Sequence, residues 1–251
     1  MSNATRRIVI VGATSAMAEH CARLWVQAAP VDLTLVGRDH GRMERVAADL
    51  RVRSPRSRIG KVCADFLNPL AIRATVDGIA RQGAVDIVLI AHGSLPEQPA
   101  CQEDLSACSE ALRVNGVSPV LFAEAFAEHM ARQGRGTLAL IGSVAGDRGR
   151  RTNYVYGAAK GLLARYAEGL QHRFAGTAVR VVLVKPGPTD TPMTAHLKAQ
   201  GVRLAGVEQV ARQVVAAIEA GKPLAYVPGR WRWIMVVIRH LPRAVFHRMK
   251  I

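Results

Sequence analysis

The sequence predicts an α/β fold in which about seven parallel strands form a doubly wound sheet with helices on both faces. Short apolar runs alternate along the chain with longer stretches of helical periodicity, the pattern of repeated strand–helix units. No internal repeat interrupts this alternation, and 251 residues with 49% hydrophobic content suffice for one domain with a substantial core. We expect strands near residues 7–11, 32–36, 59–63, 86–90, 137–142, 179–184 and 224–227.

The first expected strand, Ile8–Val11, ends at Gly12, and a helical pattern runs from Ser15 to about Ala28. A strand, a tight turn and a helix N-terminus form an anion site, because free N–H groups and the helix dipole face the ligand. The turn is therefore expected to bind the pyrophosphate of a dinucleotide. Its expected contacts are Gly12, Thr14, Ser15 and Met17.

The second expected strand is followed by Gly37-Arg38-Asp39. An acidic residue at this place bonds the adenosine ribose of NAD, whereas an arginine accommodates the 2′-phosphate of NADP. Arg38 follows the strand directly, and Arg42 lies one turn into the next helix, so NADP(H) is favoured. Asp39 keeps NAD(H) as the alternative.

Tyr156, Lys160 and Ser143 form the candidate catalytic group. Residues four apart share a helix face, so Lys160 is expected beside the Tyr156 phenol, while Tyr154 lies on another face. An ammonium about 4 Å away, at an effective dielectric of about 20, favours the phenolate by roughly 4 kcal/mol, or about three pKa units. Ser143 ends the apolar run 137–142, where its hydroxyl would hold a substrate oxygen as charge develops. An ordinary surface Tyr/Lys pair is the alternative, and the glycine turn and Ser143 argue against it.

With these motifs the chain resembles the short-chain dehydrogenase/reductase (SDR) family from Arg7 to its end. The resemblance implies a Rossmann-type sheet and a catalytic set of Asn115, Ser143, Tyr156 and Lys160. In that set Tyr156 is the general acid/base, and Lys160 lowers its pKa and bonds the nicotinamide ribose. Ser143 polarises the carbonyl, and Asn115 holds a water that relays protons.

The resemblance also implies further cofactor contacts. Asp65 is expected at the adenine, Ala91 and Gly93 after the fourth strand, Pro186 and Gly187 at the nicotinamide, and Thr189 and Thr191 at its carboxamide. Ala16 and Ala18 replace two glycines of the family's turn, which puts the turn geometry in question. His92 is a candidate substrate or cofactor contact, and the alternative is a histidine bonded into the sheet edge.

A net charge of +15 predicts anionic partners. We expect residues 1–229 to form one dinucleotide-binding catalytic domain and residues 230–251 a basic amphipathic extension. If the helix resumes in phase after Pro242, one side carries Arg232, Arg239, Arg243 and Lys250 and the opposing side carries Trp231, Ile234, Ile238, Leu241, Val245 and Met249. This pattern predicts peripheral membrane contact, and the alternative is packing over the cleft or against a partner subunit. No motif predicts nucleic-acid binding.

Arg148 and Arg151 lie between Ser143 and Tyr156 and are candidates to hold a substrate phosphate, with a solvated loop as the alternative. The stretches 143–157, 191–198 and 235–243 resemble one branch of the family, the decaprenylphosphoryl-2-keto-β-D-erythro-pentose reductases. That resemblance implies a keto-sugar on a polyprenyl phosphate, the second step of a 2′-epimerisation in cell-envelope biosynthesis, and a flavin-dependent oxidase as partner.

Other functions are weighed against this one. A soluble 3-oxoacyl or steroid-type ketone reductase is the enzymatic alternative, and a non-catalytic Rossmann sensor or scaffold is the other. Cys21, Cys63, Cys101 and Cys108 have no metal-binding spacing, so no metal is expected, and they favour a reducing cytoplasm. No apolar run reaches the roughly 20 residues of a membrane span. We expect a cytoplasmic protein, peripheral on the inner face of the membrane, and a homo-oligomer.

Overall fold

The computed structural model describes residues 5–249, and its centre is a sheet of seven parallel strands. Their order across the sheet is β3-β2-β1-β4-β5-β6-β9, which confirms the predicted doubly wound fold. The strand order reverses between β1 and β4, where a crevice opens at the carboxyl ends. The strands are β1 (Arg6–Val11), β2 (Val31–Gly37), β3 (Arg58–Cys63), β4 (Ile87–Ile90), β5 (Arg135–Ile141), β6 (Ala178–Pro186) and β9 (Leu224–Val227).

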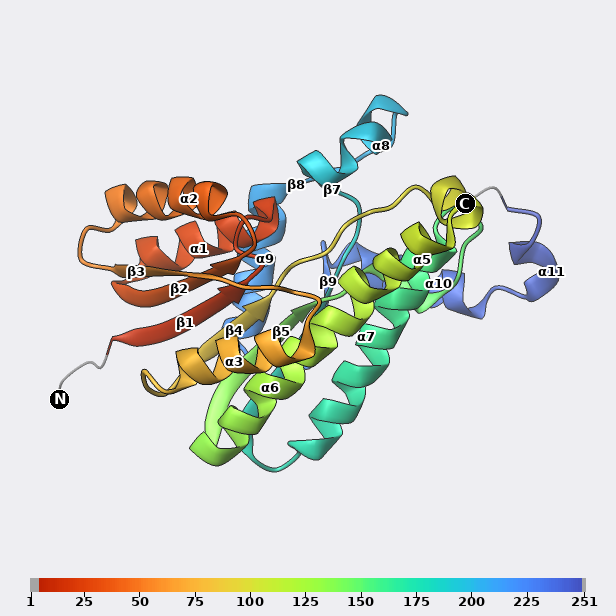
Figure 1. Cartoon of the computed structure of the whole chain (residues 1–251). Coiled ribbons are helices and arrows are strands. Elements are labelled where there is room, and N and C mark those ends of the chain that lie inside the picture. The colour runs from red at the N-terminus through yellow and green to blue at the C-terminus, as the bar shows by residue number, and fades with distance from the viewer. Residues whose placement is uncertain (1–4, 250–251) are drawn as a thin grey trace.

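Helices cover both faces of the sheet, as Figure 1 shows. One layer comprises α1 (Ala16–Ala28), α2 (His40–Arg53) and α9 (Val207–Glu219). The other comprises α3 (Pro69–Ala80), α6 (Ser118–Gln133) and α7 (Tyr154–Arg173). Because both faces are covered, the middle of β1, Ile8–Val11, is completely buried. This explains why the strand is a continuous apolar run rather than an alternating one.

The helices that follow β1 and β2 begin at side-chain caps. Ser15 Oγ accepts a hydrogen bond from Ala18 N at 3.3 Å, and Asp39 Oδ1 accepts from Arg42 N at 2.9 Å. A cap satisfies backbone N–H groups that the first helical turn leaves free. Both turns are thereby fixed at the carboxyl edge of the sheet.

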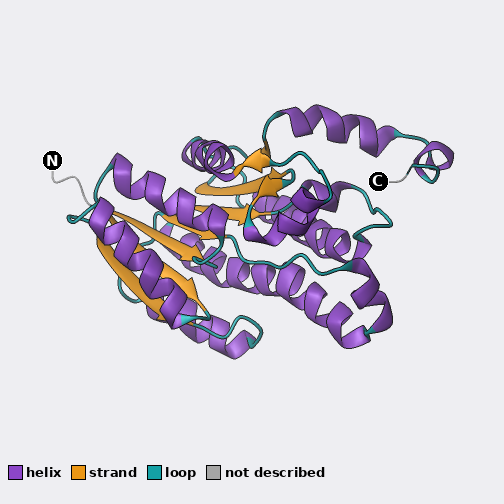
Figure 2. Cartoon of the chain, turned by 90° about the horizontal axis from the view of Figure 1, so that it is seen from above, coloured by secondary structure: helices purple, strands orange, loops and turns teal. Residues whose placement is uncertain are grey.

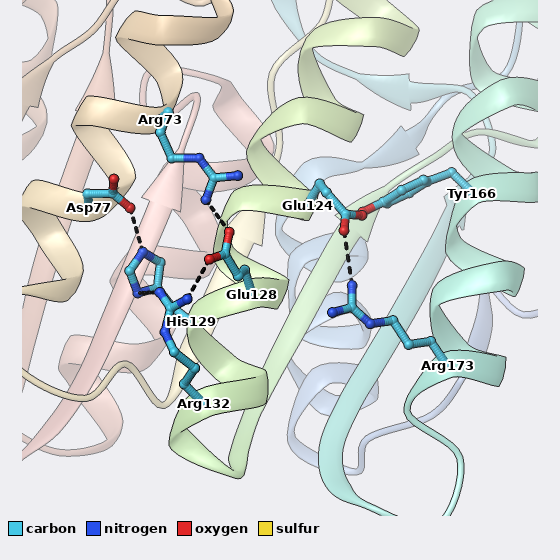
Figure 3. Close-up of polar contacts among 8 residues, drawn as sticks. All are labelled: Arg73, Asp77, Glu124, Glu128, His129, Arg132, Tyr166 and Arg173. Carbon is cyan, nitrogen blue, oxygen red and sulfur yellow. Dashed lines mark hydrogen bonds and ion pairs between the residues drawn. The ribbon is translucent and has the colours of Figure 1, made fainter.

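Helix α6 is tied to its two neighbours by polar contacts on the outside of its layer (Figure 3). Glu128 pairs with Arg73 of α3 at 2.5 Å, and Glu124 accepts from Tyr166 of α7 at 2.5 Å. His129 Nε2 lies 2.7 Å from Asp77 Oδ1. Such exposed pairs contribute about 0–1 kcal/mol each, so the buried side chains between sheet and helices remain the main source of stability.

Smaller elements surround the carboxyl edge. After β4 come α4 (Gln98–Glu103), α5 (Leu105–Leu112) and a π-helical turn over Arg113–Val117, and a 3₁₀ turn over Val144–Asp147 follows β5. After β6, the two-residue strands β7 (Thr189–Asp190) and β8 (Ala205–Gly206) flank a 3₁₀ turn (Pro192–Thr194) and α8 (Ala195–Ala199). Figure 1 shows α8 standing clear of the sheet. The π-helical turn, both 3₁₀ turns, β7 and α8 contribute residues to the wall of the cavity at this edge.

The C-terminal segment is two helices rather than one. Helix α10 (Arg230–His240) ends before Pro242, and α11 (Arg243–Phe246) follows as a separate short helix. Figure 2 shows this segment at the margin of the molecule, next to the C-terminus. The alignment of basic and apolar faces across Pro242 required a helix that resumes in phase, and the chain breaks here instead, because a proline removes a backbone donor. Lys250 lies outside the described residues.

Helix α10 packs against its own domain. Met235 is completely buried, whereas Trp233 and Val237 are 70% and 62% exposed. Within residues 5–249, no helix combines the length and apolar character needed to cross a bilayer.

Candidate active site

The four predicted catalytic residues line one cavity of about 560 Å³ at the carboxyl edge of the sheet. Ser143 follows β5, Tyr156 and Lys160 lie on the first turns of α7, and Asn115 lies in the π-helical turn before α6. Because three separate elements supply these side chains, only the folded sheet brings them together. Across the described residues, no group of three or more His, Cys, Asp or Glu side chains is arranged to hold a metal.

Lys160 is a buried cation held by a backbone carbonyl. Its side chain belongs to a residue only 4% exposed, and Nζ donates to Ile141 O at 3.0 Å. Burial lowers the pKa of Lys160 to about 8, because leaving water disfavours the ammonium. The side chain is therefore a cation near neutral pH that loses its charge in mildly alkaline solution.

The Tyr156 phenol differs from the sequence-based expectation. Burial raises the pKa of Tyr156, and a hydrogen bond with Ser143 opposes this shift only in part. Lys160 Nζ lies 5.9 Å from the centre of the Tyr156 ring, and it is directed to the Ile141 carbonyl. Desolvation of the phenol therefore raises its pKa on balance, contrary to the lowering expected from the spacing to Lys160. A phenol with a raised pKa carries its proton at neutral pH and can act as an acid.

Asn115 organises the loop after β4. Its Oδ1 accepts from Ser94 N at 2.8 Å, and its Nδ2 donates to Ala111 O at 2.9 Å. A Cβ on Gly93 would lie 2.8 Å from Asn115 Oδ1 and 3.6 Å from Lys160 Nζ, so only glycine fits between them. The amide thereby connects the π-helical turn to the cavity wall; its expected role in holding a water stays a prediction.

The glycine turn after β1 fits a dinucleotide pyrophosphate despite its two alanines. Gly12 has φ of +81°, and a Cβ there would fall 2.6 Å from the backbone N of His92. Ala16 and Ala18 lie inside α1, and no non-glycine residue within 5–249 has a positive φ. Only Gly12 needs the left-handed region, so the alanines do not distort the turn.

Arg38, Asp39 and Arg42 line the end of the cavity next to β2, where the adenosine is expected. Asp39 Oδ1 caps α2 by accepting from Arg42 N at 2.9 Å, and Arg42 Nη2 donates to Thr14 O at 3.3 Å. Asp65 is exposed and does not line the cavity, because its carboxylate accepts from Leu67 N at 2.8 Å. The neighbouring residues Phe66 and Leu67 line the cavity in its place.

The other predicted cofactor residues all line this cavity. After β6, where the nicotinamide is expected, Thr189 Oγ1 donates to Gly187 O at 2.9 Å, and Thr191 pairs with Thr194 in a cap of the following turn. The set comprises Gly12, Thr14, Ser15, Met17, Ala91, Gly93, Pro186, Gly187, Thr189 and Thr191. Their contacts with a cofactor stay predictions.

His92 lies in the cavity wall, as a ligand contact would, and it is also hydrogen-bonded to a neighbouring element, as a structural histidine would be. Its Nε2 is 2.9 Å from Ser118 Oγ, and its ring packs edge-on against Phe66 at 4.7 Å between ring centres. Its Nδ1 is buried without a partner within the described residues. Burial first, and then the charges of Lys160 and Arg38, lower the pKa of His92 to about 3, so the ring is neutral at physiological pH.

The loop after Ser143 corrects two expectations about arginines. Arg148 Nη1 donates to Leu241 O at 2.8 Å and to Ile238 O, and its guanidinium lies 3.8 Å over the Phe246 ring. Arg148 therefore holds the C-terminal end of α10 rather than lining the cavity, and Arg151 is exposed outside it.

Of the three arginines in this cluster only Arg150 lines the cavity, and sequence reasoning missed Asn153, which lines it as well. Arg150 stands in the same basic cluster as its neighbours, and no local pattern separates the three arginines. Only their different surroundings in the fold do so.

A buried ion pair attaches the loop after Ser143 to the sheet. Lys185 of β6 and Asp147 have side chains only 6% and 2% exposed and lie 2.5 Å apart, and Tyr226 of β9 donates to Asp147 Oδ2 at 2.7 Å. The loop carrying Ser143 and Arg150 is thus bound to the last two strands. Because a buried charge is costly without its partner, this loop is held firmly in place.

Comparison with known proteins agrees with this geometry. Residues 6–201 match the short chain dehydrogenase family. An uncharacterized oxidoreductase of Streptomyces coelicolor is 31% identical over 99% of this chain and 97% of its own length. A protein of Chromohalobacter salexigens named sulfoacetaldehyde reductase 2 is 30% identical over 74% of each chain.

A solved short-chain dehydrogenase from Sphingobium yanoikuyae, in complex with NADPH, superposes with a TM-score of 0.78 at 21% identity, covering 95% of this chain and 97% of that one. At such low identity this likeness concerns the fold. The match over residues 6–201 and the full-length relative identify the chain as a member of the short-chain dehydrogenase family, and thus as an NAD(P)-dependent oxidoreductase acting on CH–OH groups.

Proposed function

We propose that the protein is an NADPH-dependent reductase that converts a ketone into a secondary alcohol. The observation that carries this proposal is the meeting of Tyr156, Ser143 and Lys160 in the cavity that also contains the Gly12 turn. The nicotinamide supplies the hydride when it is bound. Because the site binds the cofactor and the ketone side by side, the bimolecular reaction becomes effectively unimolecular, which lowers its barrier.

The protein's own residues handle the proton. Tyr156 Oη donates it to the oxygen of the reduced carbonyl, and the Ser143 hydroxyl holds that oxygen as it becomes negative. Below about pH 8, Lys160 is an ammonium in the same cavity, and its charge stabilises the phenolate that remains. The raised pKa of free Tyr156 suits an acid, which must hold its proton until the substrate takes it.

The preference for NADPH rests on the adenosine end of the cavity. Asp39, the residue expected to bond the ribose of NAD, is engaged as the cap of α2. Arg38 lines the same end of the cavity. An arginine there accommodates a 2′-phosphate, whereas an engaged carboxylate is less able to serve the ribose hydroxyls of NAD.

For the substrate we propose a keto-sugar carried on a polyprenyl phosphate, reduced in the second step of a 2′-epimerisation. The support is the resemblance of the stretches 143–157, 191–198 and 235–243 to that branch of the family, together with the net charge of +15. An enzyme that oxidises the alcohol to the ketone, flavin-dependent in the branch that this chain resembles, would have to precede it. We further propose a homo-oligomer, as is usual in the family.

Helix α10 supports a peripheral position on the inner face of the membrane. Its outward side carries Trp233, Val236 and Val237, with exposed fractions of 70%, 43% and 62%. Arg232 and Arg239 are also exposed on this helix. Exposed apolar side chains beside arginines suit the surface of an anionic membrane.

A soluble 3-oxoacyl or steroid-type ketone reductase is the second candidate. It is favoured by the large apolar share of the cavity lining, which includes Met193, Leu197 and Val144. A non-catalytic sensor would need a dinucleotide site but not the additional group of Tyr156, Ser143 and Lys160. The presence of this group in the cavity argues against a sensor.

The experiment compares NADPH and NADH consumption with a polyprenyl-phosphate-linked 2-keto-pentose and with a water-soluble 3-oxoacyl substrate. Removal of residues 230–251 would also remove the buried Met235 and the carbonyls bound by Arg148, so point substitutions test the membrane contact better. Trp233→Ser combined with Val237→Ser should weaken binding to phosphatidylglycerol vesicles and lower turnover of the lipid-linked ketone. Leu70→Ser, on the exposed side of α3, is the control and should change neither.

Turnover of the soluble ketone alone, unaffected by vesicles, would discard the lipid-linked substrate and the membrane position. No consumption of either dinucleotide with either ketone would contradict the proposed reduction of these substrate classes.

A further inference from the structure

Arg150 is a cation in the cavity wall without an acidic partner. Its side chain lines the cavity that contains Tyr156 and Ser143. Its Nε is buried and has no hydrogen-bond partner, and within residues 5–249 the one acceptor of its guanidinium is Met235 Sδ, 3.6 Å from Nη2. Burial lowers the pKa of Arg150, and the charge of Asp147 opposes this shift only in part. A guanidinium has five N–H donors in a planar fork, so most of its capacity is unused.

Asp147, the carboxylate whose charge acts on Arg150, forms no ion pair with it. Asp147 is engaged with Lys185 at 2.5 Å and with Tyr226 at 2.7 Å. The acidic residues that line the cavity are Glu19 of α1 and Asp39 before α2, both at its dinucleotide end. The substrate end therefore holds the cations Arg150 and Lys160 without a carboxylate among its lining residues. An anionic ligand bound at this end would supply the missing negative partner for Arg150, because a charge that is partly removed from water is costly until it is paired.

The backbone connects Arg150 closely to the catalytic tyrosine. Asn153 N donates to Arg150 O at 3.2 Å, and Gly157 N donates to Asn153 O at 2.8 Å, so both residues lie at the start of α7, just before Tyr156. The positive end of this 20-residue helix is directed to the same region, and the Asn153 side chain does not cap it. Instead, Asn153 Oδ1 is a buried acceptor without a partner within the described residues, and its side chain also lines the cavity.

We propose that Arg150 binds an anionic group of the substrate, a phosphate, sulfonate or carboxylate, and that Asn153 Oδ1 accepts a hydrogen bond from a hydroxyl near it. This inference rests on the proposed ketone reduction and specifies its substrate class as anionic hydroxyketones. Arg150 is then a specificity-determining residue. Its planar fork matches two oxygens of one anionic group, which adds geometric selectivity to the charge.

The test measures binding rather than turnover. Isothermal titration of the enzyme–NADP⁺ complex compares dihydroxyacetone phosphate with dihydroxyacetone, a pair that differs only in the phosphate. Hydride transfer to these ketones cannot occur from the oxidised cofactor, so the measurement is independent of catalysis. Wild type should bind the phosphate compound roughly 10- to 100-fold more tightly than the neutral one.

Arg150→Gln should remove most of this preference, and Arg150→Lys should keep a part of it. Arg151→Gln is the matched control, because it removes the same charge from an exposed neighbour outside the cavity, and it should keep the full preference. Asn153→Ala should weaken the binding of dihydroxyacetone and of dihydroxyacetone phosphate by similar factors. Far-ultraviolet circular dichroism and the unfolding midpoint establish that each variant is folded.

A preference for the phosphate compound that survives in Arg150→Gln, or an Arg150→Gln variant that binds both probes more weakly by the same factor, would overturn the inference. Failure of wild type to bind NADP⁺ would instead contradict the proposed function, so the two failures are distinguishable. Farnesyl phosphate as a third probe separates the sources of the anion. If it binds more tightly than dihydroxyacetone phosphate, the site favours a lipid phosphate, and the reverse order favours a soluble phosphorylated ketone; either order depends on Arg150 under the proposal.

Discussion

Trp231 covers Gly187 so closely that a Cβ on residue 187 would fall 1.9 Å from the indole Nε1. Gly187 lines the cavity in the turn after β6, and Trp231 lies in the first turn of the C-terminal helix α10. The same helix is held at its other end by Arg148, from the loop after Ser143. The C-terminal segment is therefore in contact with two walls of the active site.

This contact predicts the effect of Gly187→Ala. The added methyl group must displace the indole, and overpacking of this kind costs about 1–3 kcal/mol of unfolding free energy. In a Trp231→Ala background the space is free, and the same substitution should cost less than about 0.5 kcal/mol. Urea unfolding of the four proteins of this double-mutant cycle measures both values. An equal cost in the two backgrounds would show that the indole does not limit residue 187.

The lowered pKa of His92 predicts that the protein loses stability against unfolding as the pH falls. The native protein protonates this residue only near pH 3, whereas the unfolded chain does so near 6.5. Between these values the unfolded state binds more protons, so the unfolding free energy falls as the pH is lowered, by up to about 1.4 kcal/mol per pH unit. From pH 7 to pH 5 this residue should account for about 2 kcal/mol of lost stability.

Denaturant unfolding of His92→Asn at the two pH values checks this prediction. The variant should lose about 2 kcal/mol less than wild type over this interval, whatever its stability at pH 7. His40→Asn, at an exposed position, is the control and should follow wild type. If His92→Asn keeps the wild-type pH dependence, His92 is not the group that titrates on unfolding.

Arg38 predicts the choice between the two dinucleotides. Arg38→Ser should weaken NADPH binding by roughly 10- to 100-fold, because the 2′-phosphate loses a charge-assisted contact, and should change NADH binding by less than about threefold. Fluorescence titration with each reduced dinucleotide gives the two dissociation constants. Equal weakening of both would indicate a general distortion of the turn after β2 instead of phosphate recognition.

The sequence was sufficient to predict the sheet because parallel strands buried on both faces are continuous apolar runs, as in Ile8–Val11 and Val181–Val184. It also predicted the meeting of Ser143, Tyr156 and Lys160, since residues after parallel strands collect at one edge of the sheet. The glycine turn followed from the break of the first run at Gly12.

What the sequence could not provide are contacts between distant segments. Arg148, Arg150 and Arg151 are indistinguishable locally, yet Arg148 binds carbonyls some 90 residues away and Arg150 lines the cavity. The raised pKa of Tyr156 has the same origin, because burial depends on the whole fold and not on the spacing to Lys160. Asp65 satisfies a neighbouring backbone N–H, a local choice that the family resemblance did not indicate.

The most direct test of the central claim is the turnover of Tyr156→Phe with NADPH and any ketone that wild type reduces. Loss of the acid should lower kcat by about 10²- to 10⁴-fold, while NADPH binding, measured by fluorescence, stays near the wild-type value. Tyr154→Phe is the matched control, because Tyr154 is two positions before Tyr156 but does not line the cavity, and its hydroxyl accepts from Gln102 Nε2. This variant should retain full activity. Wild-type turnover in Tyr156→Phe with normal NADPH binding would contradict the assignment of Tyr156 as the acid.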